Sequence, residues 1–229
     1  MKLITFAGPP SSGKTSVILQ LVKCLKAEDK TVCVVKFDCL TSFDHLRYKE
    51  NGVPVQIGFS DKVCPDHYFV TNIEDVHYWA KNKGYDYLIT ESAGLCSRCS
   101  PHITGVLGVC VIDTLAGVDT PRKVGPMLKE SDLVVVTKGD IVSQAEREVF
   151  AFNVRQVNAK AKVMFVNGIT GQGAFMLSKH IKEAAEHQTL QGNTLRFTTP
   201  SAVCSYCLGE TRIDRIFEMN MSKRLEIKE

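Results

Sequence analysis

The segment AGPPSSGKTSV, residues 7–17, constrains the fold of this chain more than any other part of the sequence. Gly8, Gly13, Lys14 and Thr15 match the pattern G-x-x-x-x-G-K-[ST], a glycine-rich loop that turns its backbone N–H groups toward phosphate oxygens. The apolar run KLITF precedes the loop, and TSVILQLVKCLKAEDK, which has helical periodicity, follows it. We therefore predict a strand, a phosphate-binding loop and a helix whose N-terminus points at the phosphates of a nucleotide.

The pattern assigns a role to each residue of the loop. Lys14 is expected to contact the β- and γ-phosphates and to act in catalysis, and the Thr15 hydroxyl to bind Mg²⁺. The other nucleotide-binding candidates in the loop are Gly8, Ser11, Ser12, Gly13 and Ser16. The alternative interpretation is an ordinary turn, rich in Gly, Pro and Ser, between a strand and a helix.

Strand and helix patterns alternate along the rest of the chain. Apolar, β-branched runs predict strands at 31–37, 53–59, 85–91, 106–114, 132–140 and 161–167. Amphipathic runs predict helices at 72–84, 121–131, 144–158 and 173–188. This alternation favours an α/β fold with a mainly parallel sheet and helices on both faces. We expect one nucleotide-binding domain over residues 1–229, with residues 193–229 as a C-terminal extension packed on it.

Two carboxylates stand at the ends of predicted strands, where ligands of open α/β sheets bind. Asp38 follows the strand at 31–37 and would hold Mg²⁺ through water or orient the attacking water; it could equally cap the next turn. Glu91 ends the strand at 85–91, where a second carboxylate that organises Mg²⁺ is expected. Asp38 and Glu91 join Lys14 as the predicted catalytic residues.

The segment TKGD, residues 137–140, ends another strand and bears on which base is bound. GTP-binding proteins carry Asn-Lys-x-Asp there, and the Asp accepts hydrogen bonds from guanine. This chain keeps Lys138 and Asp140 but has Thr137 in place of the Asn, and a plain surface turn could have the same sequence. Asn167, at the end of the last predicted strand, is a further nucleotide-binding candidate.

Together these motifs resemble the SIMIBI-class GTPases that insert nickel into hydrogenase and urease, over most of residues 2–190. The resemblance is carried by GPPSSGKTS, Asp38, ITESAG at 89–94, TKGD at 137–140 and NGITGQG at 167–173. It implies a switch that hydrolyses GTP, or alternatively ATP, with Mg²⁺ and controls metal delivery to a client metalloenzyme or its maturation proteins. It also implies a homodimer.

The urease member of this family has a Cys-Pro-His metal motif after the second strand. Here the segment VCPDH occupies that place, with one residue inserted. The resemblance therefore implies that Cys64 and His67 are metal ligands.

Cysteine usage points to further metal chemistry. The nine cysteines include two C-x-x-C pairs, Cys96/Cys99 directly after ESAG and Cys204/Cys207 near the C-terminus. Four thiolates are enough for zinc, nickel or an iron–sulfur cluster. Cysteines without a ligand, in a purely structural role, are the alternative interpretation of both pairs.

Composition bounds the remaining function classes. A formal net charge of +3 does not indicate a nucleic-acid or membrane partner. The sequence starts directly with the first predicted strand and contains no apolar stretch of membrane-spanning length, so we expect a cytoplasmic protein. Two rivals to the metal-delivery switch stay open. One is an ATP-dependent iron–sulfur carrier or electron donor, and the other is a nucleotide-regulated adaptor with structural zinc.

Overall fold

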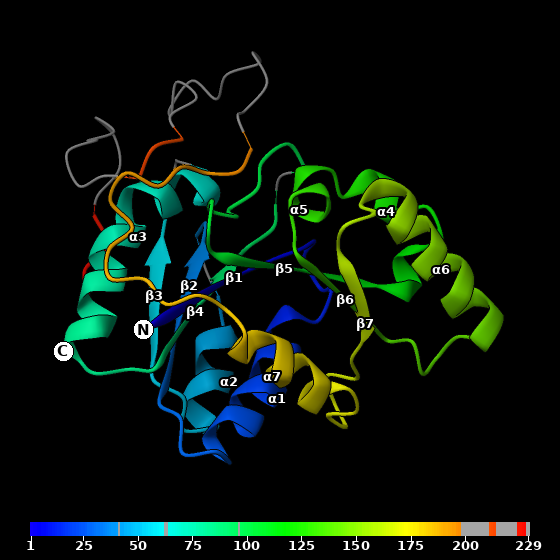
Figure 1. Ribbon diagram of the computed structural model, residues 1–229, viewed down its shortest axis with the longest axis horizontal. Helices are drawn as coiled ribbons and strands as arrows, with labels where there is room; N and C mark the ends of the chain where they lie inside the picture. Colours follow the sequence, from blue (N-terminus) through cyan, green and yellow to red (C-terminus); the bar gives the residue numbers. More distant parts are fainter. Residues whose placement is uncertain (41, 62–63, 96, 198–210, 214–223, 228–229) are drawn as a thin grey trace.

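The computed structural model describes residues 1–229 apart from 41, 62–63, 96, 198–210, 214–223 and 228–229. Within the described part, seven strands form one sheet in the order β3-β2-β4-β1-β5-β6-β7, and every neighbouring pair is parallel (Figure 1). The strands are β1 (Lys2–Ala7), β2 (Val32–Asp38), β3 (Val55–Phe59), β4 (Tyr87–Ser92), β5 (Leu107–Asp113), β6 (Leu133–Thr137) and β7 (Lys162–Phe165). The predicted α/β fold with a parallel sheet is confirmed.

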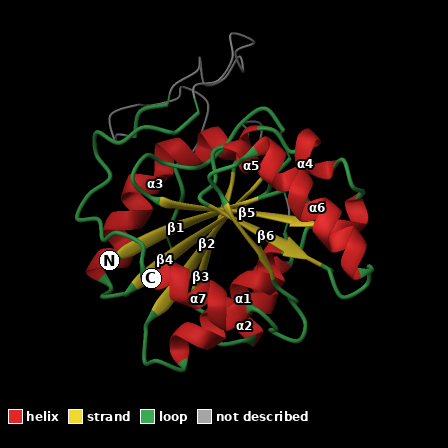
Figure 2. Ribbon diagram, turned by 45° about the vertical axis from the view of Figure 1, so that its right-hand side comes forward, coloured by secondary structure: helices red, strands yellow, loops and turns green. Residues whose placement is uncertain are grey.

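Helices cover both faces of this sheet. They are α1 (Lys14–Lys26), α2 (Asp44–Glu50), α3 (Pro65–Asn82), α4 (Thr120–Lys123), α5 (Pro126–Lys129), α6 (Gln144–Val157) and α7 (Ala174–Lys182), with a 3₁₀ turn, η1, at Thr114–Ala116. Figure 2 shows α1, α2 and α7 on one face and α3, α4, α5 and α6 on the other. The parallel strands therefore all end at one edge of the sheet, and their loops meet there.

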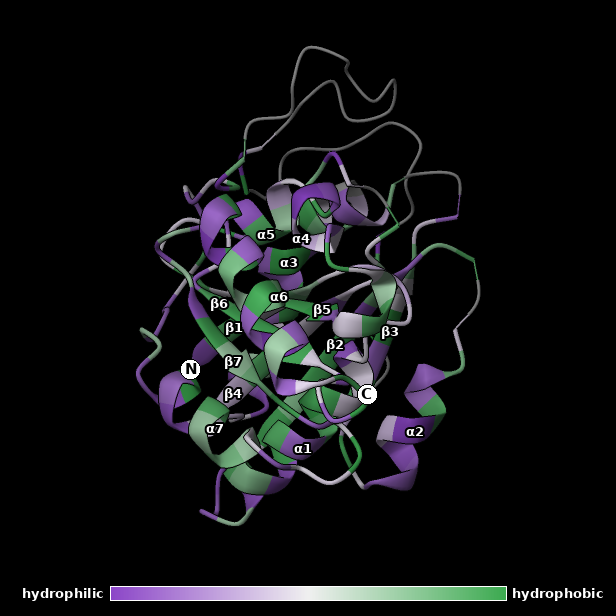
Figure 3. Ribbon diagram, turned by 90° about the vertical axis from the view of Figure 1, so that its right-hand side faces the viewer, coloured by the Kyte–Doolittle hydropathy of each residue, from purple (hydrophilic) through white to green (hydrophobic). Residues whose placement is uncertain are grey.

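Burial on both faces explains the continuous apolar character of the strands. Along β2, Val34 belongs to the apolar cluster beneath α1 and α7, whereas Val35 and Phe37 belong to the cluster beneath α3. This alternation is the period of two that a strand imposes. The hydropathy colouring in Figure 3 accordingly shows mostly hydrophobic strands in the centre and a largely hydrophilic α2 at the periphery.

Sequence signals at helix ends account for several boundaries. Helix α1 begins after Gly13, whose φ of 91° is left-handed and suits glycine. Helix α6 begins with a capping box, in which Ser143 Oγ accepts from the Glu146 N–H and the Glu146 carboxylate accepts from the Ser143 N–H.

Four elements differ from the sequence prediction. Helix α2 was not predicted, because within its seven residues only Tyr48 is buried and no periodic apolar stripe is visible. Helix α3 begins at Pro65, not at residue 72, since a proline at the first helical position needs no N–H partner. The predicted helix at 121–131 is two single turns, α4 and α5, and α7 ends at Lys182.

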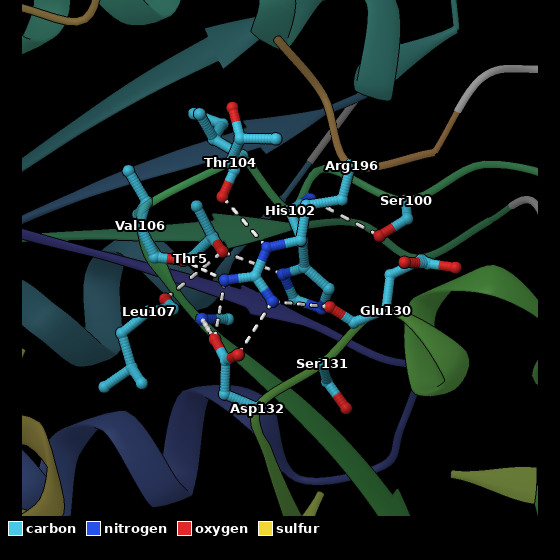
Figure 4. A network of polar contacts seen from close by, with 12 residues as sticks. Thr5, Ser100, His102, Thr104, Val106, Leu107, Glu130, Ser131, Asp132 and Arg196 are labelled. Carbon is cyan, nitrogen blue, oxygen red and sulfur yellow. Dashed lines mark hydrogen bonds and ion pairs between the residues drawn. The ribbon is translucent and has the colours of Figure 1, made fainter. Parts of the chain in front are cut away.

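The described part of the C-terminal region is held to the main body by Arg196 (Figure 4). Its guanidinium makes a bidentate pair with Asp132, at 2.7 and 2.9 Å, and donates to the carbonyl oxygens of Ile103, Val106 and Glu130. The Arg196 N–H also donates to the carbonyl oxygen of His102. This network fixes the segment around Arg196 against the loop that precedes β5.

His102 is fully buried at the centre of the same network. Its Nδ1 lies 2.8 Å from Thr5 Oγ1 and its Nε2 lies 3.1 Å from the carbonyl oxygen of Met127. Burial, reinforced by the charge of Arg196, lowers the pKa of His102 to about 4. The imidazole is therefore neutral at pH 7.

Among the described residues, no helix is both long enough and apolar enough to cross a membrane.

Candidate nucleotide-binding site

A cavity of about 550 Å³ opens at the edge of the sheet where the strands end. Its lining includes the phosphate-loop residues Ser11, Gly13, Lys14, Thr15 and Ser16. It also includes Asp38 from β2, Glu91 from β4, Lys138 and Asp140 after β6, and Asn167 after β7. The structure thus brings residues from five separate parts of the sequence around one space.

Two glycines, Gly8 in the phosphate loop and Gly94 after β4, lie where a side chain has no room. At Gly8, where φ is 144°, a Cβ atom would lie 2.0 Å from the carbonyl oxygen of Val111. At Gly94, where φ is 72°, a Cβ atom would lie 1.7 Å from the carbonyl oxygen of Gly8. The loop after Glu91 therefore lies directly against the phosphate loop.

Lys14 lies inside the loop with only 6% of its surface exposed. Its ammonium group donates to the carbonyl oxygens of Gly8 and Pro9, both at 2.8 Å. Burial lowers the pKa of Lys14. An anion beside the ammonium would raise this pKa again, because it stabilises the charged form.

Ser12 provides a second sign that the loop is shaped for an anion. Its side chain is fully buried, and within the described structure its Oγ has no hydrogen-bond partner. A buried hydroxyl without a partner costs free energy, about 1–3 kcal/mol, unless a ligand supplies one. A phosphate oxygen fits that requirement.

Glu91 connects the phosphate loop to helix α2. Only 1% of its surface is exposed; Oε1 accepts from Thr15 Oγ1 at 2.8 Å and Oε2 accepts from the Tyr48 hydroxyl at 2.6 Å. Burial, together with the nearby charge of Glu91, raises the pKa of Tyr48 well above its usual value, so the hydroxyl stays a donor.

Asp38 caps a turn and also lies beside a charged group of the cavity. Its Oδ1 accepts from the backbone N–H of Cys39 at 2.8 Å and caps the turn after β2. Its Oδ2 lies 3.6 Å from the ammonium of Lys36. One carboxylate oxygen thus shapes the loop and the other belongs to the charge cluster of the cavity.

The oxygen atoms around Thr15 suit a magnesium ion. Mg²⁺ prefers hard oxygen ligands, and the Thr15 hydroxyl and the carboxylates of Asp38 and Glu91 line the same cavity. The chemistry of this donor set fits the ion.

The TKGD segment contacts the phosphate loop through two side chains. Thr137 Oγ1 donates to the carbonyl oxygen of Ser12 at 2.7 Å, and Lys138 Nζ donates to that of Ser11 at 3.0 Å. Lys138 also lies 3.3 Å from Asp113 Oδ1. These contacts leave the exposed carboxylate of Asp140 at the wall of the cavity.

Asn167 serves its own loop as well as the cavity wall. Its Oδ1 accepts from the backbone N–H groups of Ile169 and Thr170, at 2.9 and 3.0 Å. The side chain therefore holds the turn after β7 in place at the edge of the cavity.

Sequence reasoning missed four residues that reach this site: Lys36, Asp44, Arg47 and Tyr48. A lysine inside the otherwise apolar strand VCVVKFD was the one available signal. The other three lie on α2, which has no visible periodicity.

The predicted metal ligands are only partly within the described structure. Cys96, Cys204, Cys207 and the side chain of His67 lie outside the described residues. Cys64 is the half-buried N-cap residue of α3, and Cys99 is buried. Among the residues that the structure describes, no three His, Cys, Asp or Glu side chains are grouped closely enough to hold a metal ion.

The parallel sheet, the phosphate loop and the strand-end carboxylates define a P-loop NTPase of the SIMIBI class, as the sequence resemblance implied. A family model described as the CobW/HypB/UreG nucleotide-binding domain matches residues 2–165, and the chain belongs to this family.

Similar proteins agree with this membership. The uncharacterized protein MJ0120 of Methanocaldococcus jannaschii is 45% identical over 99% of this chain and 97% of its own length. The hydrogenase maturation factor HypB of Archaeoglobus fulgidus matches in structure with a TM-score of 0.63 and 19% identity, over 80% of this chain and 89% of HypB. HypB of Helicobacter pylori, crystallised with nickel, matches with a TM-score of 0.63 and 20% identity, over 82% and 91%. At these identities the two structural matches show a shared fold.

Proposed function

We propose that this protein is a GTP-hydrolysing switch that controls the delivery of a metal ion to a client metalloenzyme or its maturation proteins. The observation that carries the proposal is the convergence of Lys14, Thr15, Asp38, Glu91 and the TKGD segment on one cavity. Membership of the CobW/HypB/UreG family supports it.

Hydrolysis requires positioning and charge neutralisation more than covalent chemistry. Lys14 would exchange its carbonyl partners for the β- and γ-phosphates. Thr15, held by Glu91, would face the metal ion, and Asp38 would orient the water that attacks the γ-phosphorus. Bound Mg²⁺ supplies positive charge to the phosphates. The products are the diphosphate and inorganic phosphate.

Asp140 supports guanine as the base. Its carboxylate accepts hydrogen bonds only, which suits the donor edge of guanine and not the acceptor atoms of adenine.

Replacing Asp140 by Asn should weaken GTP binding by about 1.5–3 kcal/mol, the value of a hydrogen bond to a charged group, and leave ATP binding unchanged. Calorimetric titration of both nucleotides into both proteins measures this. Equal affinity of the wild type for GTP and ATP contradicts the guanine assignment.

One contact supports coupling between the proposed Cys64/His67 site and the nucleotide. Asp66, in the first turn of α3, accepts a hydrogen bond from Ser92 Oγ at 2.7 Å, one residue after Glu91. The helix that starts after Cys64 is therefore joined to the strand that carries a catalytic candidate. A displacement of Glu91 would be transmitted to the start of α3.

The Arg196 network supports a common location for the two C-x-x-C pairs. Cys99 lies three residues before His102, and Cys204 lies eight residues after Arg196. Because the Arg196 N–H donates to the His102 carbonyl, both pairs are within a short length of chain of the same contact. A four-thiolate site for zinc, nickel or an iron–sulfur cluster is therefore within reach.

Exposed apolar residues around the cavity support the proposed homodimer. Leu95, Ile141 and Ile169 line the cavity, yet from 59% to 88% of their surface is exposed. A second copy placed over the cavity mouth would cover them.

Metal analysis and an absorption spectrum of anaerobically purified protein test the metal side of the proposal. Bound zinc or nickel whose affinity changes with nucleotide supports the switch. A brown protein that prefers ATP indicates the iron–sulfur carrier instead. Zinc held equally in all nucleotide states indicates the adaptor.

A further inference from the structure

A lysine that no nucleotide-binding motif includes lies beside the proposed catalytic carboxylates. Lys36, on β2, lines the cavity with 4% of its surface exposed. Its ammonium group lies 3.4 Å from Glu91 Oε1 and 3.6 Å from Asp38 Oδ2, and it also pairs with Asp44. Three carboxylates thus surround one buried ammonium group.

Three side chains of α2 contact residues of the same cavity. Asp44, Arg47 and Tyr48 have the spacing i, i+3, i+4 and share one face of α2. Asp44 pairs with Lys36, Arg47 Nη2 donates to Ser16 Oγ at 3.0 Å, and Tyr48 donates to Glu91. All three contacts end on residues of the proposed nucleotide site.

Positive charge is needed in this part of the cavity if a triphosphate is to bind. The carboxylates of Asp38, Asp44 and Glu91 line it and would repel the phosphates. Lys14 and Lys36 both line this cavity. Two ammonium groups in one cavity favour the binding of an anion there.

Building on the proposed nucleotide site, we propose that Lys36 is a second phosphate-binding lysine, specific for the terminal phosphate of a nucleoside triphosphate. In the free protein its ammonium holds Asp38, Asp44 and Glu91 together. On binding of the triphosphate it turns to the γ-phosphate, since a lysine head on a flexible stem can exchange one anionic partner for another. The pair with Asp44 weakens at the same time, so α2 responds to the presence of the γ-phosphate and not to the diphosphate.

Nucleotide titrations of two variants test this assignment. We compare the Mg²⁺ complexes of GDP and of a non-hydrolysable GTP analogue by calorimetry, in the wild type, Lys36→Met and Asp44→Asn. Lys36→Met should reduce affinity for the analogue about tenfold or more, the effect of losing one hydrogen bond between charged groups, and leave GDP affinity nearly unchanged. Asp44→Asn should raise affinity for the analogue relative to GDP, because a carboxylate that competes for Lys36 is gone. Lys162→Met, at an exposed position on β7, is the matched control and should change neither affinity.

The outcomes separate this inference from the proposed function. A wild type that binds neither nucleotide overturns both. A wild type that binds both, with equal losses for GDP and analogue in Lys36→Met or with no loss, overturns only the role of Lys36. If Lys36→Met does not fold, as judged by circular dichroism, Asp44→Asn decides: unchanged or reduced preference for the analogue overturns the inference.

Discussion

The buried ammonium of Lys14 donates to two backbone carbonyl groups of the phosphate loop, where it is placed to serve a ligand. Lys14→Ala should therefore reduce nucleotide hydrolysis on the order of 100-fold or more, the usual effect of removing one preorganised donor from a transition state. The far-ultraviolet circular dichroism spectrum should stay nearly unchanged. A phosphate-release assay and the spectrum measure the two effects.

Lys23→Ala is the matched control, since Lys23 is an exposed lysine on the same helix, α1. It should hydrolyse nucleotide at the wild-type rate. Retained turnover in Lys14→Ala would mean that the loop is a structural turn.

His102 predicts a specific loss of stability in acid. Its pKa is about 4 in the folded protein and about 6.5 when exposed, so the unfolded chain takes up a proton first as pH falls. The stability that the neutral imidazole contributes is complete above pH 6.5 and is lost progressively between pH 6.5 and 4. It amounts to about 3 kcal/mol, from 1.36 kcal/mol per pKa unit.

Urea unfolding of wild type and His102→Gln at several pH values between 7 and 4 isolates this contribution. Glutamine keeps hydrogen-bonding capacity near Thr5 and the Met127 carbonyl but has no proton to take up in this range. The difference in unfolding free energy between the two proteins should shrink as pH falls through the window. A constant difference would contradict the pKa of His102.

At the scale of elements, burial decides what could be predicted from the sequence. The segments 31–37 and 85–91 are close to β2 and β4, because strands covered on both faces must be continuously apolar. Helix α2 has no such signature: its place is fixed by polar contacts of Asp44 with Lys36 and of Tyr48 with Glu91. The Tyr48 hydroxyl, for example, meets Glu91 43 residues further along the chain.

The same distinction applies to the candidate site. Lys14, Thr15, Asp38 and Glu91 stand next to a recognisable loop or at strand ends, where a local pattern is enough to nominate them. Lys36 has only its place inside an apolar strand as a sequence signal, and its role becomes visible through the three carboxylates around it, from β2, α2 and β4. A local sequence pattern does not specify which side chains the fold brings into contact.

The Arg196 side chain makes five of the hydrogen bonds that attach the surrounding C-terminal segment to the main body. Arg196→Ala would leave the carbonyl oxygens of Ile103, Val106 and Glu130 without this donor and Asp132 without its bidentate partner. We expect faster hydrogen exchange at residues 193–196 and new proteolytic cleavage there, because local opening follows the loss of such contacts. Exchange in β1 and β4 should not change.

Arg155→Ala provides the comparison, since Arg155 is an exposed arginine in the last turn of α6. Hydrogen exchange followed by mass spectrometry reads both variants. Unchanged protection at residues 193–196 in Arg196→Ala would show that the remaining contacts, the hydrogen bonds to Thr104 and the packing of Leu195, are enough to hold the segment.

At the scale of the whole molecule, direct contacts connect the phosphate loop and the end of β4 to the segments that carry the candidate metal ligands. The close contact of Gly94 with Gly8 places the loop that leads to Cys96 and Cys99 against the phosphates' expected position. The hydrogen bond between Ser92 and Asp66 joins the helix that starts after Cys64 to the end of β4. Motion of the end of β4 therefore reaches both cysteine-containing segments.

This arrangement predicts that nucleotide and metal affinities are coupled. With a typical coupling free energy of 1–3 kcal/mol, a non-hydrolysable GTP analogue should change metal affinity about 5–150-fold, and the metal should change nucleotide affinity by the same factor. Metal titration against a competing chelator, in the nucleotide-free, GDP and analogue states, measures it. Replacing both Cys96 and Cys99 by Ser should abolish the coupling while nucleotide still binds through residues 8–15. Because thiolates must lose protons to bind a metal, the affinity in every state should fall as pH is lowered. Identical metal affinity in all three states would reject the switch and favour a structural metal.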